Sequence, residues 1–213
     1  MRPPALLASG LALAGATIVA ALTVGALAVF TNTDAIGTNS FATAACFPNT
    51  DTGLLDPSAQ AADTGGDADG FETTPTNAFA DAGGVASNVD GAADRHRFYT
   101  YGVSIDSGCT ISGIEVRLDW LVDSTADTST MDVELSWDAG TTWTTAKTTT
   151  NQSTTEVTET LGGAADTWGR TWTVANLSDA NFRVRITSAC SGAGCAARDF
   201  SLDWAPVKIS YTQ

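Results

Sequence analysis

Four acidic residues in a glycine-rich stretch have the types and spacing that a calcium ion requires. Ca²⁺ takes about six to eight oxygen ligands from carboxylates and carbonyls. Gly65, Gly66 and Gly70 would let the backbone between the acids fold around an ion. The four acids lie within ten residues and are Asp63, Asp67, Asp69 and Glu72. The stretch therefore fits two interpretations, a solvated acidic loop and a calcium site.

Catalysis has little support in the sequence. The single histidine, His96, lies among charged residues in the stretch DRHR, and the Gly-x-Ser-x-Gly motif of hydrolases is absent. A glycosidase requires two carboxylates in one cleft. The acids of this chain fall in loops and on the expected outer faces of strands instead. We therefore expect that the protein is not an enzyme.

Three tryptophans and an arginine are candidates for stacking against a sugar ring. Trp168, Arg170 and Trp172 share one face if their segment is extended, and Trp143 precedes them. If that face is open, it resembles the platform of a carbohydrate-binding module. The alternative is that these tryptophans cover one end of a hydrophobic core.

The octapeptide SWDAGTTW, residues 136–143, matches the pattern Ser-x-Asp-x-Gly-x-Thr-Trp, which is called an Asp box. The motif opens with Ser136; Asp138 would accept hydrogen bonds from the turn, Gly140 would supply a positive φ, and Trp143 would pack back on the hairpin. The pattern resembles hairpins of sialidases and other glycoside-processing β-propellers, where it repeats away from the catalytic pocket. A single copy in a chain this short implies a hairpin and not an activity.

The four cysteines predict two disulfide bonds, because an even number of cysteines is typical of exported proteins. Cys190 and Cys195 flank a short Ser-Gly-Ala-Gly loop that could close on itself, which leaves Cys46 to pair with Cys109. A zinc site is the alternative, but the cysteines have no zinc-binding spacing.

Alternating apolar and polar residues predict a series of strands from Arg95 onward. No segment has a helical stripe of useful length, so we expect an all-β fold, a jelly-roll-type β-sandwich of about eight antiparallel strands. Trp120, Trp137 and Trp204 fall at inward positions. The expected strands are residues 97–105, 114–120, 131–137, 154–161, 167–174, 182–186, 200–204 and 207–211.

The outward positions of these strands carry charges of both signs. On neighbouring antiparallel strands such residues form cross-strand ion pairs, and a charged ligand face is the alternative. The residues concerned are Glu115, Arg117, Asp119, Asp132, Glu134, Arg183 and Arg185.

The N-terminal part is apolar and unlike the rest. Residues 3–33 carry no charge, and Ala26-Leu27-Ala28 places small residues where a signal peptidase cleaves. We expect a signal peptide over residues 1–28, with an uncleaved membrane anchor or a pilin-like stem as alternatives. An extended segment over residues 29–62 and a β-sandwich domain over residues 63–213 follow.

The acidic balance limits the partners. The chain has 24 acidic and 10 basic residues and a net charge of −14, which disfavours nucleic acid and anionic lipid. We expect a secreted or cell-surface location, with membrane contact only through an uncleaved N-terminal segment. Asn151 and Asn176 begin N-glycosylation sequons, whose use depends on the host.

The stretch ALAVFTNTDAIGTNSFATA resembles the start of the camelysin and biofilm-matrix fibre proteins of bacteria. In those proteins a signal ending near an alanine is followed by an aromatic residue, a Thr/Asp pair and a short Asn-x-Phe strand. The matching residues here are Ala28, Phe30, Thr33-Asp34 and Asn39-Ser40-Phe41. In such fibres an N-terminal strand completes the sheet of the next subunit. The resemblance implies that residues 29–45 are a donor strand, with Phe30, Ile36 and Phe41 as its apolar residues.

A second resemblance covers about Asp63 to Tyr211. The segments DRHRFY, ISGIEVRLD, VELSWDAGTTWT, DTWGRTW and NFRVRI resemble a β-sandwich module that recurs in bacterial and archaeal surface proteins and has no assigned chemistry.

These observations predict a secreted structural subunit of an extracellular or cell-surface filament. Each copy would add its N-terminal strand to the next copy, so the expected partner is the protein itself. A carbohydrate-binding or adhesive surface module, with a glycan as partner, is the alternative. A lone membrane-anchored surface protein is a third hypothesis.

Overall fold

The computed structural model describes residues 46, 50–91 and 93–213. The predicted signal peptide and the predicted donor-strand residues Phe30, Ile36 and Phe41 lie outside the described residues. Within the described part of the chain, no helix has the length and apolar character needed to cross a membrane.

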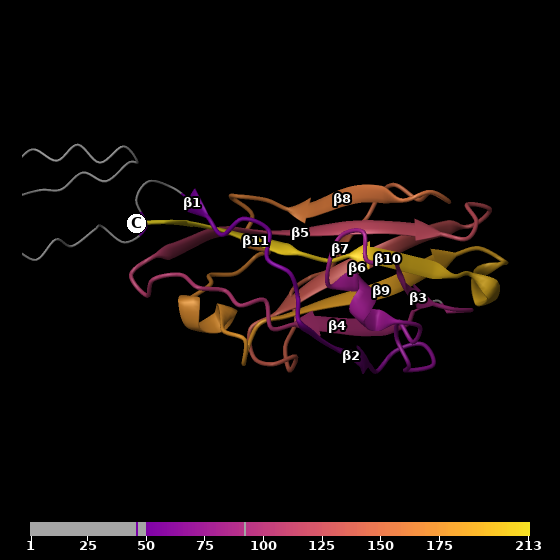
Figure 1. Ribbon diagram of the computed structural model, residues 1–213, viewed down its shortest axis with the longest axis horizontal. Helices are drawn as coiled ribbons and strands as arrows, with labels where there is room; N and C mark the ends of the chain where they lie inside the picture. The colour runs from indigo at the N-terminus through magenta and orange to yellow at the C-terminus, as the bar shows by residue number, and fades with distance from the viewer. Residues whose placement is uncertain (1–45, 47–49, 92) are drawn as a thin grey trace, which may run out of the picture. The chain divides into compact units, whose positions relative to one another are not determined.

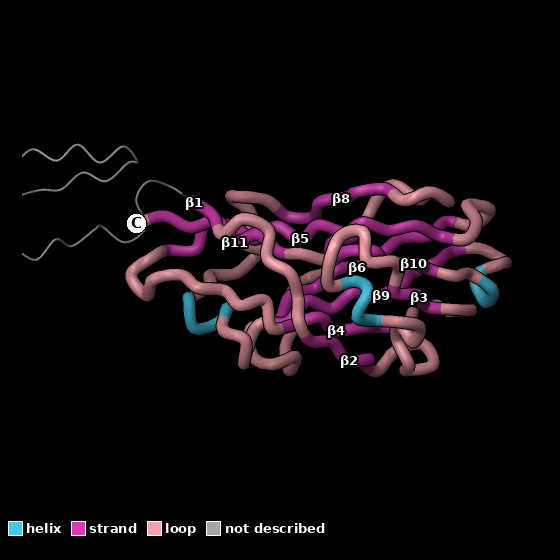
Figure 2. The backbone as a smooth tube through the Cα atoms, in the orientation of Figure 1, coloured by secondary structure: helices cyan, strands magenta, loops and turns pink. Residues whose placement is uncertain are grey.

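Two antiparallel sheets of six and five strands form the described part of the chain, which confirms the predicted all-β sandwich (Figure 1). Helices are limited to three short 3-10 turns, η1 (Pro75–Ala78), η2 (Val174–Leu177) and η3 (Cys195–Ala197), and the rest is strand and loop (Figure 2). The strands are β1 (Thr50–Asp51), β2 (Ala59–Asp63), β3 (Ala86–Asn88), β4 (Arg95–Tyr99), β5 (Thr110–Val122), β6 (Thr128–Ser136), β7 (Lys147–Thr148), β8 (Val157–Gly162), β9 (Arg183–Ser191), β10 (Phe200–Trp204) and β11 (Val207–Thr212).

The long strand β5 organises the six-stranded sheet. On one side the first half of β5 pairs with β11 and the second half pairs with β10. Strand β1 pairs with the far side of β11, and β3 pairs with the far side of β10. On the other side β5 pairs with β8. The five-stranded sheet has the order β2-β4-β9-β6-β7. Strands β4, β9 and β6 are central in it, so their inward side chains supply one wall of the core.

The core lies between the two inner faces and is built from the alternating apolar residues. Strand β5 contributes Val116, Leu118 and Trp120, all fully buried. Strand β6 contributes Met131 and Leu135 from the other sheet. Burying a large apolar side chain stabilises a fold by about 1.5–3 kcal/mol. The period-two pattern therefore accounts for both the strands and their orientation.

The sandwich begins earlier in the chain than the expected boundary at residue 63. Strand β2 pairs with β4 along its whole length, from Ala59 opposite Tyr99 to Asp63 opposite Arg95. All five β2 residues are only half-buried, so the segment lacks the alternation that marks the later strands. The prediction was therefore wrong at this boundary, because β2 is short, alanine-rich and lies at a sheet edge.

The predicted strand over residues 167–174 is not a strand. Trp168 and Gly169 both have positive φ values, 56° and 74°, and they reverse the chain there. Thr173 then caps η2, accepting a hydrogen bond from the backbone N–H of Asn176. The sequon asparagine Asn176 completes the cap, since its Oδ1 accepts the N–H of Thr173 at 3.1 Å.

Only one of the three tryptophans expected in the core is fully buried. Trp120 has no exposed surface. In β10 the register shifts between Leu202, opposite Trp120, and Trp204, opposite Asp119. This bulge moves Trp204 to the outer face, where its Nε1 donates to Asp56 at 2.8 Å. Trp137, just after β6, is half-buried at the margin of the core.

Both predicted disulfides are confirmed. Cys46 pairs with Cys109, with 5.7 Å between their Cα atoms, and ties the start of the described chain to the turn before β5. Cys190 pairs with Cys195 across a 5.5 Å Cα separation and closes the loop between β9 and η3. Disulfides persist in oxidising compartments, so these two bonds indicate such an environment.

Candidate functional site

The Asp box forms the hairpin that its residues predict. The Oγ of Ser136 donates to Asp138 Oδ1 at 2.9 Å and accepts the N–H of Gly140 at 2.9 Å. Asp138 Oδ1 also accepts the N–H of Thr142 at 2.8 Å. Both Ala139, with φ 61°, and Gly140, with φ 91°, have positive φ values. Ser136 is fully buried, so its hydroxyl serves the turn and is not presented to a ligand.

The expected sugar platform is not open. Trp168 and Trp172 are 5% and 3% exposed, and both belong to the hydrophobic core. Trp168 Nε1 donates to the carbonyl of Ile114 at 2.9 Å, and Trp172 Nε1 donates to that of Thr167 at 2.9 Å. Both rings therefore pack in the hydrophobic core, as the alternative interpretation expects, and do not form an open glycan face. The reversal at Trp168 removes the extended geometry on which it depended.

Arg170 and Trp143 are also occupied by contacts within the protein. The Arg170 guanidinium lies 3.7 Å from the ring centroid of Trp137 and 4.5 Å from that of Trp172. Burial lowers the pKa of Arg170. The Arg185 guanidinium lies 4.1 Å from the ring centroid of Trp143. These arginine–tryptophan stacks stabilise the end of the sandwich.

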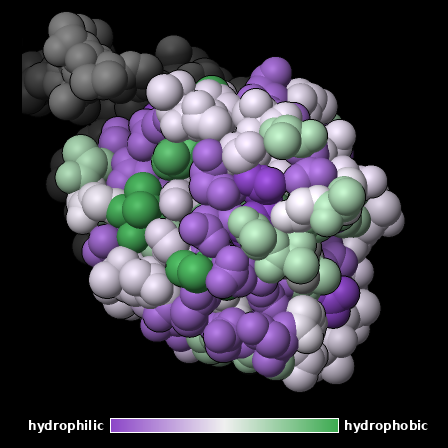
Figure 3. Space-filling model, turned by 90° about the vertical axis from the view of Figure 1, so that its right-hand side faces the viewer, coloured by the Kyte–Doolittle hydropathy of each residue, from purple (hydrophilic) through white to green (hydrophobic). Residues whose placement is uncertain are grey.

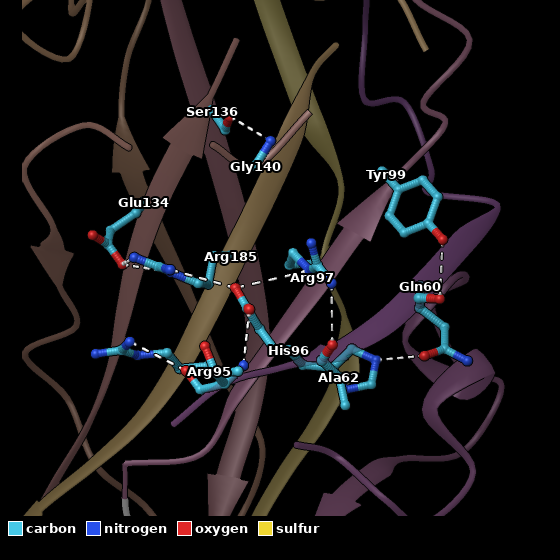
Figure 4. A network of polar contacts seen from close by, with 12 residues as sticks. Gln60, Ala62, Arg95, His96, Arg97, Tyr99, Glu134, Ser136, Gly140 and Arg185 are labelled. Carbon is cyan, nitrogen blue, oxygen red and sulfur yellow. Dashed lines mark hydrogen bonds and ion pairs between the residues drawn. The ribbon is translucent and has the colours of Figure 1, made fainter. Parts of the chain in front are cut away.

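Asp63 lies in an ion-pair network on the outer face of the five-stranded sheet. Its Oδ2 is 3.4 Å from Arg185 Nη1 and 3.8 Å from Arg97 Nε. Arg185 also forms an ion pair with Glu134, the residue opposite it on β6, at 2.7 Å (Figure 4). On the other sheet Lys208 pairs with Glu115 at 2.9 Å. The predicted cross-strand pairs thus form at Glu115 and Glu134, whereas Arg117 pairs with Asp119 on its own strand. Asp132 bonds Thr148, and Arg183 donates to backbone carbonyls. Asp63 does not join the other acids of its loop.

The acidic group that the structure does bring together is Asp67, Asp69 and Asp94. Oxygen atoms of these three carboxylates all lie within 4.8 Å of one another. Glu72 is engaged elsewhere, since its Oε1 accepts the N–H of Val89 at 2.8 Å. Two of the four predicted ligands therefore converge, and they meet an acid that the sequence reasoning missed. Asp94 lies 27 positions from Asp67, so no local spacing pointed to it.

Mutual proximity shifts the pKa values of this group. A hydrogen bond with Asp69 lowers the pKa of Asp67, and the same contact raises the pKa of Asp69 to about 6. Burial raises the pKa of Asp94, which is 1% exposed. The residues present can hold a metal ion, because carboxylate oxygens are the ligands that hard divalent cations prefer.

Side chains bond backbone groups on β2, an edge strand, and on β6, which the two-residue strand β7 pairs with only in part. On β2, the carbonyls of Gln60 and Ala62 accept hydrogen bonds from Tyr99 Oη at 3.3 Å and Arg97 Nη2 at 3.3 Å (Figure 4). On β6, the N–H groups of Met131 and Leu135 donate to threonine hydroxyls at 2.8 and 3.0 Å. An edge whose backbone groups are already bonded does not accept another strand.

The outer edge of β8 differs. Val122 N–H donates to Ser153 and Gly163 N–H donates to Ile114, so the even-numbered β5 residues between them direct their backbone groups toward β8. Leu118 faces Glu159 in this pairing. Backbone groups alternate along a strand. The backbone N–H and C=O groups of Thr158 and Thr160 therefore point away from β5. Within the described residues, none of these backbone groups has a hydrogen-bond partner.

Strand β8 is also an edge strand of its sheet, and Thr158 and Thr160 are both exposed (Figure 1). The end of the molecule in Figure 3 is mostly hydrophilic or neutral, with scattered apolar residues. The large hydrophobic side chains that are exposed in the described residues are Leu54 and Val89. The features that remain available for function are thus an open strand edge and an acidic group, neither of which is an apolar pocket.

Comparison with known proteins identifies no family. No family model matches the chain, and no curated protein matches it significantly. Among solved structures, the chain is similar to an endo-1,4-β-D-xylanase 10B of Clostridium thermocellum, comprising CBM22-1 and GH10 modules complexed with xylohexaose. The TM-score is 0.35 and the identity 14%, over 79% of this chain and 28% of that one. A likeness at this level assigns no function to the chain.

Proposed function

We propose that the protein is an exported structural subunit of an extracellular or cell-surface filament. Residues 29–45 of one copy would add as a strand to the β8 edge of the next copy. The observation that carries the proposal is the exposed edge at Thr158 and Thr160, whose outward backbone groups have no partner in the described residues. The two disulfides support export, because they require an oxidising environment.

The length of the N-terminal segment suits this role. An extended strand rises about 3.3 Å per residue, so the 17 residues 29–45 would reach about 55 Å. β8 has six residues and needs only about 20 Å of partner. The segment continues into Cys46, which the disulfide fixes beside β5. The segment is therefore attached to a fixed point on its own subunit and is long enough to pair with another.

Strand addition of this kind makes an open polymer. The donor segment and the β8 edge are different surfaces of one chain, so each copy uses one of them with each neighbour. Backbone hydrogen bonds would supply the pairing, and Phe30, Ile36 and Phe41 would supply apolar contacts. The alternative of a carbohydrate-binding module loses support, because Trp168 and Trp172 are buried.

A bound calcium ion belongs to the same proposal. Acidic groups that can hold a metal ion are present in the described residues. An exported protein meets calcium at concentrations that extracellular sites bind, with dissociation constants of about 10⁻⁴–10⁻³ M.

The substitution Thr160→Pro tests the proposed edge. Proline removes an N–H that points outward, so it blocks strand addition while keeping the bonds between β8 and β5. We expect the wild-type exported chain and the control Thr160→Ala to form fibres in electron micrographs. Thr160→Pro should sediment as a monomer with unchanged circular dichroism.

Two results would overturn the proposal. One is a wild-type chain that stays monomeric in salt and calcium, with residues 29–45 protected from proteolysis by pairing with their own subunit. The other is a Thr160→Pro chain that forms the same fibres as the wild type.

A further inference from the structure

The geometry points to a Ca²⁺ site formed by Asp67, Asp69, Asp94 and Asn88, which joins the loop after β2 to the turn after β3. This inference deepens the calcium binding included in the proposed function by naming its ligands, and it does not depend on filament formation. Neither Asn88 nor Asp94 is among the residues that the sequence pattern singled out as calcium ligands.

The first support is the convergence of three carboxylates from two separate segments. Asp67 and Asp69 lie in the loop between β2 and η1, and Asp94 immediately precedes β4. Their oxygens lie within 4.8 Å of one another. The group is held in place, since Asp94 Oδ1 accepts the N–H of Asp67 at 2.8 Å. Three negative groups at this separation repel one another unless a cation or protons lie between them.

The second support is independent of the acids. Asn88 is fully buried at the end of β3, and its Oδ1 has no hydrogen-bond partner. Its Nδ2 is fixed by donating to Ser188 Oγ at 2.8 Å, and that hydroxyl in turn donates to the carbonyl of Gly91 at 3.3 Å. A buried amide oxygen without a partner is destabilising. A cation would satisfy it.

The orphaned oxygen lies beside Asp94, one of the three acids of the group. A methyl group added at Gly91 would collide with both Asn88 Oδ1 and Asp94 Oδ2, so these two oxygens border the same small space. One positive ion bound between these two oxygens would satisfy both of them. Gly66 packs as tightly against the other oxygen of Asp94, Oδ1.

The chemistry of the donors selects calcium. All four side chains offer oxygen, which suits Ca²⁺ and Mg²⁺ rather than the softer metals that prefer nitrogen or sulfur. Ca²⁺ tolerates irregular geometry, and carbonyls or water can complete its coordination in a half-exposed loop. Mg²⁺ demands a regular octahedron. Nearby cations do not fill the position: Arg95 Nη1 donates to the carbonyl of Thr64 at 3.2 Å.

The other group of possible ligands in the described residues does not compete. It consists of Asp127, Cys190 and Cys195. Both cysteines are joined in a disulfide, and Asp127 pairs with Arg198 at 3.0 Å. Neither sulfur is therefore available to a metal.

Calorimetric titration of Ca²⁺ into the chelator-treated exported chain tests the site at neutral pH. We expect one ion per chain with a dissociation constant of about 1 mM or below, the range of extracellular sites. Asp69→Asn changes an exposed residue and should weaken binding at least tenfold. Glu72→Gln removes a charge from the same loop without removing a ligand, so its affinity should stay within about threefold of wild type.

Thermal melting gives a second readout. Calcium should raise the melting temperature of the wild type and of Glu72→Gln, and Mg²⁺ at the same concentration should raise it less. The shift should be lost in Asn88→Ala, whose metal-free melting temperature serves as its own reference. Absence of heat and of a melting shift at 10 mM Ca²⁺, or equal affinity in wild type and Asp69→Asn, would overturn the proposal.

The Thr160→Pro chain separates this inference from the filament. It should bind calcium like the wild type whether or not fibres form. Calcium binding without fibres would leave the site standing and remove the filament proposal, and fibres without calcium binding would do the reverse.

Discussion

The Nε2 of His96 lies 2.6 Å from Oε1 of Gln60. On the other side of the ring, Nδ1 accepts the backbone N–H of Phe71 at 3.0 Å, which places the proton of the neutral imidazole on Nε2. Burial lowers the pKa of His96 to about 4, and the charge of Arg97 adds to the effect. The histidine is thus a neutral structural residue that links β2, the following loop and β4.

This arrangement predicts acid sensitivity. The unfolded chain protonates His96 near its ordinary pKa of about 6.5, whereas the folded chain does so only near 4. The stabilisation is therefore complete above pH 6.5 and is lost as the pH falls toward 4, by about 3 kcal/mol. Urea unfolding at several pH values in a chelating buffer measures the loss, and His96→Gln should flatten it. An imidazole that titrates near 6.5 by NMR would contradict the prediction.

Ser136→Ala should weaken the Asp-box hairpin. The substitution removes the hydroxyl that bonds Asp138 and Gly140 and leaves a buried N–H without its acceptor. We expect a loss of about 1–3 kcal/mol in the free energy of unfolding, measured with urea. Thr141→Ala, at an exposed position of the same turn, is the control and should change stability by less than about 0.5 kcal/mol. Equal effects of the two substitutions would show that the buried hydroxyl contributes nothing particular.

Trp172→Ala should act on stability. The ring packs edge-on against Phe182, with centroids 5.8 Å apart, and is 3% exposed. Truncating a buried aromatic residue costs about 3–5 kcal/mol, so the melting temperature should fall sharply. Trp143→Ala, at a half-buried position, should cost less. Selective loss of glycan-array binding at unchanged stability would instead restore the carbohydrate-binding hypothesis.

The two disulfides should differ in their effect on stability. The Cys46–Cys109 bond spans 63 positions and the Cys190–Cys195 bond spans five. In the chain-entropy model, replacing the long-range pair by serines costs about 4 kcal/mol and replacing the short-range pair about 2. Chemical denaturation of the two double variants measures the difference. If the short-range pair proved the more costly to remove, local packing around η3 would outweigh chain entropy.

The sequence by itself determined the fold class, the disulfide pairing and the Asp-box hairpin. These features depend on local patterns: alternation of apolar residues, the four-residue spacing between Cys190 and Cys195, and the turn chemistry of Ser136 to Trp143. Local patterns are readable because strand orientation and turn geometry depend on neighbours in the chain. They fail where one extra residue inverts the parity, as it does in β10 before Trp204.

Only the tertiary structure decided which side chains meet. It buried Trp168 and Trp172, paired Asp63 with Arg185, and brought Asp94 to Asp67 and Asp69. Within the described residues, it also left the outward backbone groups of β8 without partners, while side chains bond carbonyls of β2 and N–H groups of β6. Such contacts join residues far apart in the chain, and their positions follow from strand register and sheet order. No local pattern in the sequence specifies that register, so the acidic group and the open edge became visible only in the folded chain.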